Sequence, residues 1–299
     1  MATLEETPPL ARAAADSGLP VYNDIASVAA YEKQGLEYHD LCDPHLLEDD
    51  APAFYGFWGS CLNSYRDTAE HAGYAILRKW KQRLIDASEA TDGVDAHFHR
   101  VFAAEEIYEL HGSLENWQCA GAVVGRQPCE IVWTLPRETR FQVDPESMHS
   151  DGPTCLQCGE QARPNVLMFH DKNWHANIED EDRYVAWEAV MEQMLEDDPS
   201  LKLVVLEIGC GKRVPSVRRE TEMVVADAFT RCAARHDSES ASQQVSLVRI
   251  NPDFPECDND ELLERDLVVS VRAKGLEALT AIDSLLPASR SADATPLTQ

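Results

Sequence analysis

The sequence predicts an α/β protein in which crossover helices join the strands of a parallel sheet and a small cysteine-bearing module is inserted between its parts. Three observations support this fold class. Apolar, β-rich runs alternate with helical patterns along much of the 299-residue chain. The C-terminal half contains a clear strand, helix, strand unit. Residues 112–163 have shorter segments, no long helical stripe and most of the clustered cysteines.

The strand, helix, strand unit begins at residues 201–209, LKLVVLEIG, a near-continuous apolar run suited to burial on both faces of a sheet. A glycine turn follows, and Pro215 then stands where the first turn of a helix tolerates proline. Residues 245–251, VSLVRIN, return as a second strand. The unit therefore predicts two parallel strands joined by a helix.

Three further segments have helical periodicity. Residues 181–195 place four apolar side chains on one stripe, which predicts a core-facing helix; they are Tyr184, Trp187, Val190 and Met194. Residues 67–84 predict a packed helix with Asp67 as N-cap and Glu70 three residues on. Its apolar face comprises Ala72, Ile76, Trp80 and Leu84. Residues 277–286 form the third pattern, and a frayed tail is expected after it.

Charge and composition exclude some functions. The chain has 26 basic and 53 acidic residues, a net charge of -27, which repels phosphate backbones and anionic lipids. We therefore expect no direct nucleic-acid binding; the charge is either a solvated surface or an attraction for a lysine-rich partner. No apolar run approaches the roughly 20 residues of a membrane span, and the N-terminus lacks signal features. A cytoplasmic or nuclear protein that does not bind membranes is expected.

The cysteines suggest a metal site. Nine cysteines, an odd number without a secretory signal, favour thiols and metal over a disulfide framework. Cys155 and Cys158 have the spacing of half a tetrahedral zinc site, and Cys119 and Cys129 would supply the other half if a loop or hairpin brought them together. Such a four-sulfur site would be closed and structural. The alternative is a set of reduced structural cysteines without metal.

Two features could serve a ligand. Gly209 and Gly211 lie between the buried strand and the helix, where free backbone N–H groups can hold the phosphate or hydroxyls of a nucleotide, although any tight turn uses glycine. Asn251, at the end of the next strand, would reach the same crevice or complete a turn. His111 also ends a strand, where an imidazole is either a general base or a structural residue.

Taken in order, several motifs resemble the sirtuin family of NAD-dependent protein deacylases. They are ADSGLPVYND (15–24), GVDAHF (93–98), ELHGS (109–113), the four cysteines, RPNVLMF (163–169), GCGKRVP (209–215) and RIN (249–251). The resemblance implies a Rossmann-like parallel sheet with helices on both faces and a small inserted zinc-binding module. Residues 1–111 would start the Rossmann-like domain and include a helical cofactor-loop region, 112–163 would form the module, 164–285 would complete the domain, and 286–299 would be a disordered tail.

The same resemblance implies the chemistry and the site. In this family the acyl oxygen of an acylated lysine attacks C1′ of the nicotinamide ribose, nicotinamide leaves, a histidine base activates a ribose hydroxyl, and the acyl group passes to ADP-ribose. His111 would be that base. The residues implied for NAD are Asp16, Ser17, Gly18, Asp95, Gly209, Cys210, Gly211 and Asn251. Val166, Leu167 and Phe169 would line the acyl-lysine tunnel, and the nearby backbone would pair with the substrate peptide as an added strand. Structural zinc would be held by Cys119, Cys129, Cys155 and Cys158.

Departures from the family pattern keep alternatives open. Leu10 to Arg12 stand where the family has Gly-Ala-Gly, Asn23 replaces an arginine, Gly93 replaces an asparagine, and His170 and Asp171 replace Gly-Glu. Side chains at the lost glycines would crowd the phosphates. The sequence therefore predicts an NAD-dependent deacylase, with two alternatives: a non-catalytic module that binds an acylated peptide or ADP-ribose, and a mono-ADP-ribosyltransferase.

Overall fold

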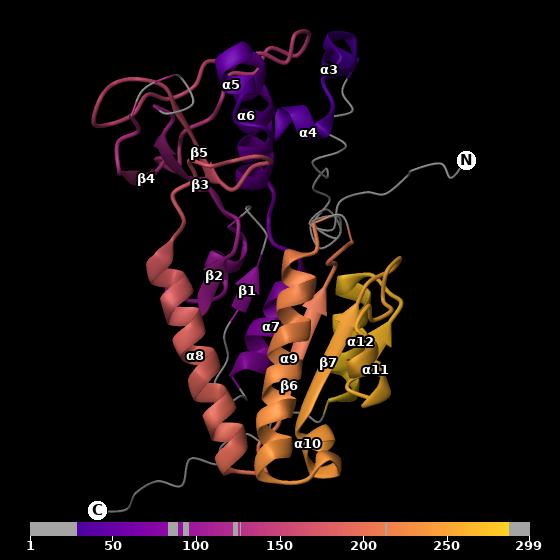
Figure 1. The fold of residues 1–299 in the computed structure, drawn as a ribbon. Helices are drawn as coiled ribbons and strands as arrows, with labels where there is room; N and C mark the ends of the chain where they lie inside the picture. Colours follow the sequence, from indigo (N-terminus) through magenta and orange to yellow (C-terminus); the bar gives the residue numbers. More distant parts are fainter. Residues whose placement is uncertain are drawn as a thin grey trace, which may run out of the picture.

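The computed structural model describes residues 29–82, 89–91, 96–121, 125, 127–212 and 214–286. The chain forms an upper half of helices and antiparallel strands above a lower half built on parallel strands (Figure 1). The helices of the upper half are α3 (Ala29–Gln34), α4 (Tyr38–Leu41), α5 (Leu46–Asp49) and α6 (Ala51–Asp67). Its strands are β3 (Gly112–Cys119), β4 (Val132–Thr134) and β5 (Ala162–Val166).

The lower half contains a parallel sheet in the order β6-β7-β8. Its strands are β6 (Leu203–Ile208), β7 (Val245–Ile250) and β8 (Val268–Val271). Leu203 lies opposite Val245, and Leu247 lies opposite Val268. The helices α9 (Ser216–Arg235) and α10 (Ser238–Gln244) connect β6 to β7. The predicted strand, helix, strand unit is therefore confirmed, with Pro215 as the N-cap of α9.

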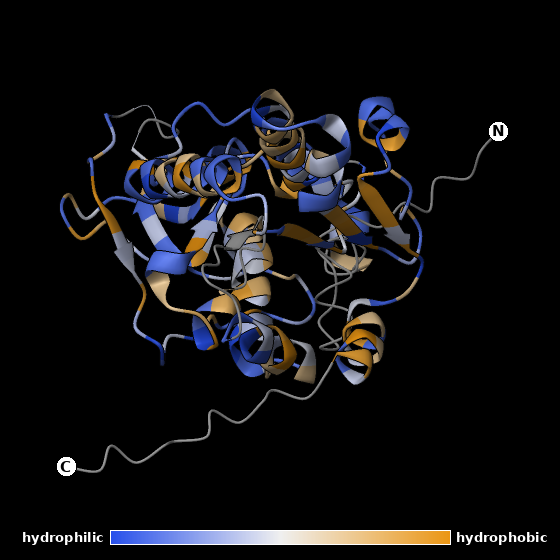
Figure 2. Cartoon of the chain, turned by 90° about the horizontal axis from the view of Figure 1, so that it is seen from below, coloured by the Kyte–Doolittle hydropathy of each residue, from blue (hydrophilic) through white to orange (hydrophobic). Residues whose placement is uncertain are grey.

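Both faces of this sheet carry helices, as the fold class predicted. Figure 1 shows α12 (Gly275–Leu285) and α11 (Asp260–Glu264) on the far side of β7 from α9, and the view from below in Figure 2 shows helices on both sides of the strands. The buried core under α9 is Leu195, Val225, Ala228, Phe229, Cys232, Ala241, Val245, Leu247, Cys257, Leu262 and Leu267. The expected burial of residues 201–209 on both faces is wrong at Val204, which is 60% exposed. Its side chain points away from the α9 face, since side chains alternate along a strand.

A second parallel pair completes the lower half. Strands β1 (Glu89–Thr91) and β2 (Ile107–Glu109) pair in parallel. The short 3₁₀ helices η1 (Phe98–Arg100) and η2 (Ala104–Glu106) precede β2. Helix α8 (Ile178–Asp197) packs against α9 and β2, with the rings of Tyr108 and Tyr184 stacked 5.3 Å apart. Helix α7 (Ala72–Lys81) packs on α12, where the Trp80 indole N–H donates to the Asp283 carboxylate.

Two of the predicted helices need correction in detail. Asp67 is the last residue of α6, not an N-cap; α7 is capped instead by His71, whose Nδ1 accepts a hydrogen bond from the N–H of Gly73. The apolar stripe on α8 turns away from the core at Val190, which is 56% exposed, while Tyr184 and Leu195 are buried. Leu84 and the tail predicted after residue 286 lie outside the described residues.

The upper half has one core that joins its helices to its strands. The sheet order is β4-β3-β5, all antiparallel, and the Trp117 ring stacks between Tyr55 of α6 and Phe141. The Tyr55 hydroxyl also donates to the carbonyl of Ala162 in β5, at 2.7 Å. Core residues between 31 and 65 therefore share one hydrophobic cluster with residues between 114 and 168. Among the described helices, none combines the length and apolarity needed to cross a bilayer.

The contact between α6 and the loop at Met148 yields the first prediction. A Cβ added at Gly56 would lie 1.7 Å from the Met148 carbonyl oxygen. In a helix, alanine is normally more stable than glycine by about 1 kcal/mol. The cost of the clash with the Met148 carbonyl exceeds this gain, so Gly56→Ala should destabilise the protein by about 2–3 kcal/mol. Urea denaturation measures the change. Ser64→Ala on the same helix is the control and should stay within about 0.5 kcal/mol. A Gly56→Ala protein as stable as the native one would contradict the packing.

Carboxylates gather between α8 and α9. The carboxyl groups of Glu188, Glu192 and Asp227 lie within 4.8 Å of one another. Burial, followed by the charges of Glu220, Glu192 and Asp227, raises the pKa of Glu188 to about 7. Arg231 offsets part of this charge through an ion pair with Glu192 at 3.2 Å. The two helices are therefore held together against a repulsion that grows as the pH rises.

This repulsion gives the second prediction. Because the pKa of Glu188 is higher in the folded than in the unfolded chain, its favourable contribution is complete below about pH 4.5 and is lost as the pH rises through 7. Glu188→Gln should therefore gain about 1–2 kcal/mol over the native protein at pH 8, after discounting for solvent screening, and almost nothing at pH 5. Urea denaturation in EDTA at both pH values tests this, with exposed Asp182→Asn as control. An equal effect of Glu188→Gln at both pH values would refute it.

Candidate active site at the junction of the two halves

His111 lies where the chain passes from the lower half into the upper half, between β2 and β3. The N–H of Leu167 donates to the His111 carbonyl at 2.9 Å. The next residue, Gly112, has a φ of 77°, and a Cβ there would lie 2.0 Å from the Asn165 carbonyl oxygen. Only glycine fits this position without strain. The backbone at the junction is therefore held on β5, and the direction of the His111 side chain is fixed with it.

The His111 imidazole points to the start of α9. Its Nε2 lies 3.1 Å from the hydroxyl oxygen of Ser216, the first residue of that helix. Burial lowers the pKa of His111 below its ordinary value of 6.5. The imidazole is therefore neutral at neutral pH, which is the state that a general base requires.

The predicted glycine turn and Asn251 come together at the carboxyl ends of β6 and β7. Gly209 has a φ of 76°, and its N–H donates to the Ile250 carbonyl at 2.9 Å. The Cys210 carbonyl accepts hydrogen bonds from the Asn251 side-chain amide at 2.8 Å and from Arg218 at 3.3 Å. Gly211 follows in the same turn and is buried. The turn thus lies at the edge of a parallel sheet where ligands bind in such folds.

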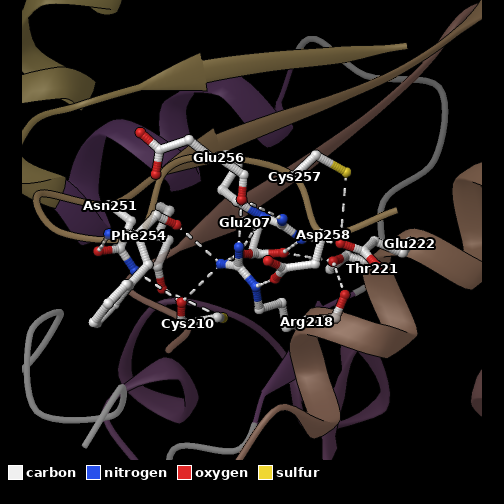
Figure 3. A network of polar contacts seen from close by, with 12 residues as sticks. Glu207, Cys210, Arg218, Thr221, Glu222, Asn251, Phe254, Glu256, Cys257 and Asp258 are labelled. Atoms are coloured by element: carbon white, nitrogen blue, oxygen red, sulfur yellow. Dashed lines mark hydrogen bonds and ion pairs between the residues drawn. The ribbon is translucent and has the colours of Figure 1, made fainter. Parts of the chain in front are cut away.

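The Asn251 side chain is engaged by the protein. It is 1% exposed, and its carboxamide oxygen accepts from the N–H groups of Asp253 and Phe254, both at 3.0 Å. Figure 3 shows it between this loop and Cys210. In this structure Asn251 therefore shapes the loop that follows β7, and a contact with a nucleotide stays a prediction.

A buried ionic network fixes the same edge (Figure 3). The carboxylate of Glu207 in β6 binds Arg249 of β7 at 2.8 Å and lies 3.6 Å from Arg218 of α9. Arg249 also binds Glu222 of α9 at 2.8 Å, and the Thr221 hydroxyl donates to Glu207 at 2.7 Å. Burial opposes the charge on Arg249, but its bonds to Glu207 and Glu222 outweigh that effect and raise its pKa. The network joins two strands to the first turns of α9.

Arg218 extends this network to the loop after β7. Its guanidinium donates to the carbonyls of Phe254, at 3.0 Å, and Glu256, and it pairs with the carboxylate of Asp258. Lys212, in the glycine turn, binds the same carboxylate at 2.7 Å. The glycine turn, the loop of residues 251–258 and the start of α9 are therefore held as one unit.

The residues predicted for the acyl-lysine tunnel follow one another at the end of β5. Val166 is buried, Leu167 is 38% exposed, and Phe169 packs edge-on against Tyr38 at 6.0 Å. The N–H of Phe169 donates to the Cys42 carbonyl at 3.0 Å. With the N–H of Leu167 bound to His111, two backbone donors of this segment already have partners in the protein.

The two substituted residues after Phe169 have defined positions. Asp171 pairs with Arg163 of β5 at 2.7 Å, and both side chains are fully buried. His170 has a φ of 54° and binds Asp43 at 3.0 Å. The buried pair fixes the loop that leads away from β5.

The four predicted cysteines converge. The sulfurs of Cys119, Cys129, Cys155 and Cys158 lie within 4.8 Å of one another, and those of Cys119 and Cys158 are 3.8 Å apart. Zn–S bonds of about 2.3 Å in a tetrahedron place the sulfurs about 3.8 Å apart. Burial opposes the Cys155 thiolate, but the N–H groups of Cys158 and Gln157 outweigh it and lower its pKa to about 7. The cluster is compatible with structural zinc, and the antiparallel pairing of β3 and β4 supplies the hairpin that the sequence required.

Some predicted positions lie outside the described residues: Asp16, Ser17, Gly18 and Asp95, together with the departures at Leu10 to Arg12, Asn23 and Gly93. The sequence did not lead us to Ser216 or to the network of Glu207, Arg218 and Arg249. The glutamate at position 207 within an apolar strand could have indicated the network, because a buried carboxylate needs a buried partner.

Comparison with known proteins agrees on one family. The sequence model of the Sir2 family matches residues 13–184 of this chain. An NAD-dependent protein deacetylase of Caldanaerobacter subterraneus subsp. tengcongensis is 22% identical over 163 residues, 54% of this chain and 58% of the relative. The chain thus spans little more than half the length of that relative.

Solved structures share the fold. A Sir2 homologue in complex with NAD superposes with a TM-score of 0.59 at 17% identity, covering 92% of this chain and 86% of the other. A Sir2 mutant with a deacetylated p53 peptide and 3′-O-acetyl ADP-ribose gives a TM-score of 0.55 at 17% identity, covering 92% and 90%.

Proposed function

The chain belongs to the Sir2 family, and from this premise we propose that it is an NAD-dependent protein-lysine deacylase that transfers an acyl group from lysine to ADP-ribose and releases nicotinamide. The observation that carries the proposal is the position of His111. A neutral imidazole stands at the junction of the two halves, hydrogen bonded to the helix that begins just after the glycine turn. NAD, when bound, would supply the ADP-ribose acceptor and the nicotinamide leaving group.

The residues of this chain would then have separate tasks. The Nε2 of His111 would accept the proton of a sugar hydroxyl, which is general-base catalysis. The backbone of the glycine turn and the N-terminus of α9 would face the negative charge of a dinucleotide. Leu167 lies beside His111, because its N–H is bonded to the His111 carbonyl, and together with Val166 and Phe169 it would hold the acyl chain.

The partner we propose is an acylated lysine in a peptide or protein. A net charge of -27 would attract a basic peptide and raise its rate of association. The Sir2 structure solved with a deacetylated p53 peptide supports this class of substrate.

A second candidate is a binding module that recognises an acylated peptide or ADP-ribose without turnover. Two observations favour it: the Asn251 amide is already bonded within the protein, and the N–H groups of Leu167 and Phe169 have intramolecular acceptors. The replacement of Gly-Ala-Gly by Leu10 to Arg12 points the same way. The two candidates differ in nicotinamide release.

The third prediction tests the enzyme directly. With NAD and an acetyl-lysine peptide, the protein should release nicotinamide, and His111→Ala should slow the steady-state rate of release at least 100-fold, since each turnover needs the base and general-base catalysis contributes about 10²–10⁴. The native rate should fall as the pH drops through a pKa below 6.5, where His111 becomes protonated. Chromatography of released nicotinamide measures both effects. His236→Ala, on the Glu196 carbonyl far from the junction, is the control and should keep its rate. Background release by native and variant alike would eliminate the enzyme and leave the binding module.

The fourth prediction concerns the cysteine cluster, which we propose holds structural zinc. Elemental analysis should find about one zinc per chain, and Cys155→Ser should lose the metal and lower the melting temperature, because binding a structural metal is part of the folding free energy. Cys232→Ala, in the core under α9, should keep the metal. A native protein without zinc whose melting is unchanged by chelators would overturn the assignment.

A further inference from the structure

We propose that Ser216 is a positioning residue that holds the His111 imidazole with Nε2 as its proton-accepting nitrogen. The inference rests on the proposed function and adds a residue to it. Its basis is the contact of 3.1 Å between the Ser216 hydroxyl and His111 Nε2, made across the junction between β2 and α9.

Ser216 is held firmly enough to orient another side chain. It is the first residue of a 20-residue helix, between Pro215 and the buried Val217. Two residues further on, Arg218 binds the carbonyls of Cys210, Phe254 and Glu256. The first turn of α9 therefore cannot shift without breaking these buried bonds. The backbone position from which the Ser216 side chain extends is fixed with it.

The hydroxyl is not used as a helix cap. Serine near a helix start commonly accepts a hydrogen bond from a free backbone N–H of the first turn. Here Pro215 occupies the N-cap position of α9 and makes no side-chain cap bond, while Ser216 stands one residue inside the helix. Its hydroxyl is directed to His111 instead, so a role limited to helix capping does not account for the contact.

The surroundings select the direction of the hydrogen bond. The N-terminus of α9 carries partial positive charge, which disfavours a protonated imidazole and favours a nitrogen lone pair on that side. Ser216 therefore donates its O–H to Nε2, and the ring proton stays on Nδ1. Nε2 is then the basic nitrogen and faces the start of the helix. For a sugar hydroxyl to give its proton to Nε2, the serine O–H must first turn away from the lone pair of that nitrogen, and the serine oxygen can then accept the new Nε2–H.

Histidine NMR tests the tautomer in the free protein. In ¹⁵N-histidine-labelled protein, His111 is identified as the signal missing from His111→Gln. The native ring should be the Nδ1–H tautomer. Ser216→Ala should change the tautomer mixture and raise the His111 pKa, because the lost donor favoured the neutral ring, whereas Ser216→Thr should preserve both. Ser238→Ala is the matched control, since Ser238 is likewise the first residue of a helix, α10.

Kinetics give the second readout. Ser216→Ala should lower kcat for nicotinamide release about tenfold with KM for NAD changed less than twofold, and Ser216→Thr should recover most of the rate. An unchanged tautomer and kcat in Ser216→Ala, or equal loss in Ser216→Ala and Ser216→Thr, would overturn the inference while the deacylase stands. If the native protein releases no nicotinamide, the deacylase fails, and the NMR comparison alone then supports or overturns the positioning role.

Discussion

A carboxylate buried between two arginines is the constraint on which the candidate site depends. Glu207, in the middle layer of the molecule, is shared by Arg249 of the neighbouring strand and Arg218 of the helix above. Removing such charges from water is expensive, and the cost is offset only where several hydrogen bonds satisfy each group. Thr221, Glu222 and the carbonyls of the following loop provide those bonds. Because a half-broken network would leave an uncompensated buried charge, its geometry is strongly selected.

This network has consequences beyond stability. It fixes the glycine turn, the loop after β7 and the first turn of α9 in one arrangement, and the last of these carries Ser216. On the other side, Gly112 and Leu167 hold the backbone of His111 against β5. His111 and the glycine turn therefore lie on different segments of the fold, and the contact between His111 Nε2 and the Ser216 hydroxyl joins the two sides. Preorganisation of this kind would suit the general-base role that we propose for His111.

The sequence could predict much of the fold, and the reasons are local. Residues 245–250 form a strand and residues 275–285 a helix, as predicted, because their hydrophobic periodicity is a strong local signal. The spacing of Cys155 and Cys158 identified half of the four-cysteine cluster. Where a prediction was wrong, the local sequence allowed two arrangements and the packing of whole elements decided which one formed. Asp67 has the chemistry of an N-cap but ends the previous helix, because α6 uses the adjacent apolar residues to cover the antiparallel sheet. Val190 is apolar, yet the neighbouring helix lies on the other side of α8.

The sequence by itself determined the alternation of strands and helices, the pair of cysteines at 155 and 158, and the presence of a histidine at a strand end. These properties depend on side-chain chemistry and on spacing within a few residues. Only the tertiary structure decided that His111 faces Ser216, that the Asn251 amide donates to the Cys210 carbonyl, and that Glu207 lies between two arginines. Each of these pairs joins residues from different elements, and their meeting follows from how whole elements pack, which no local pattern encodes.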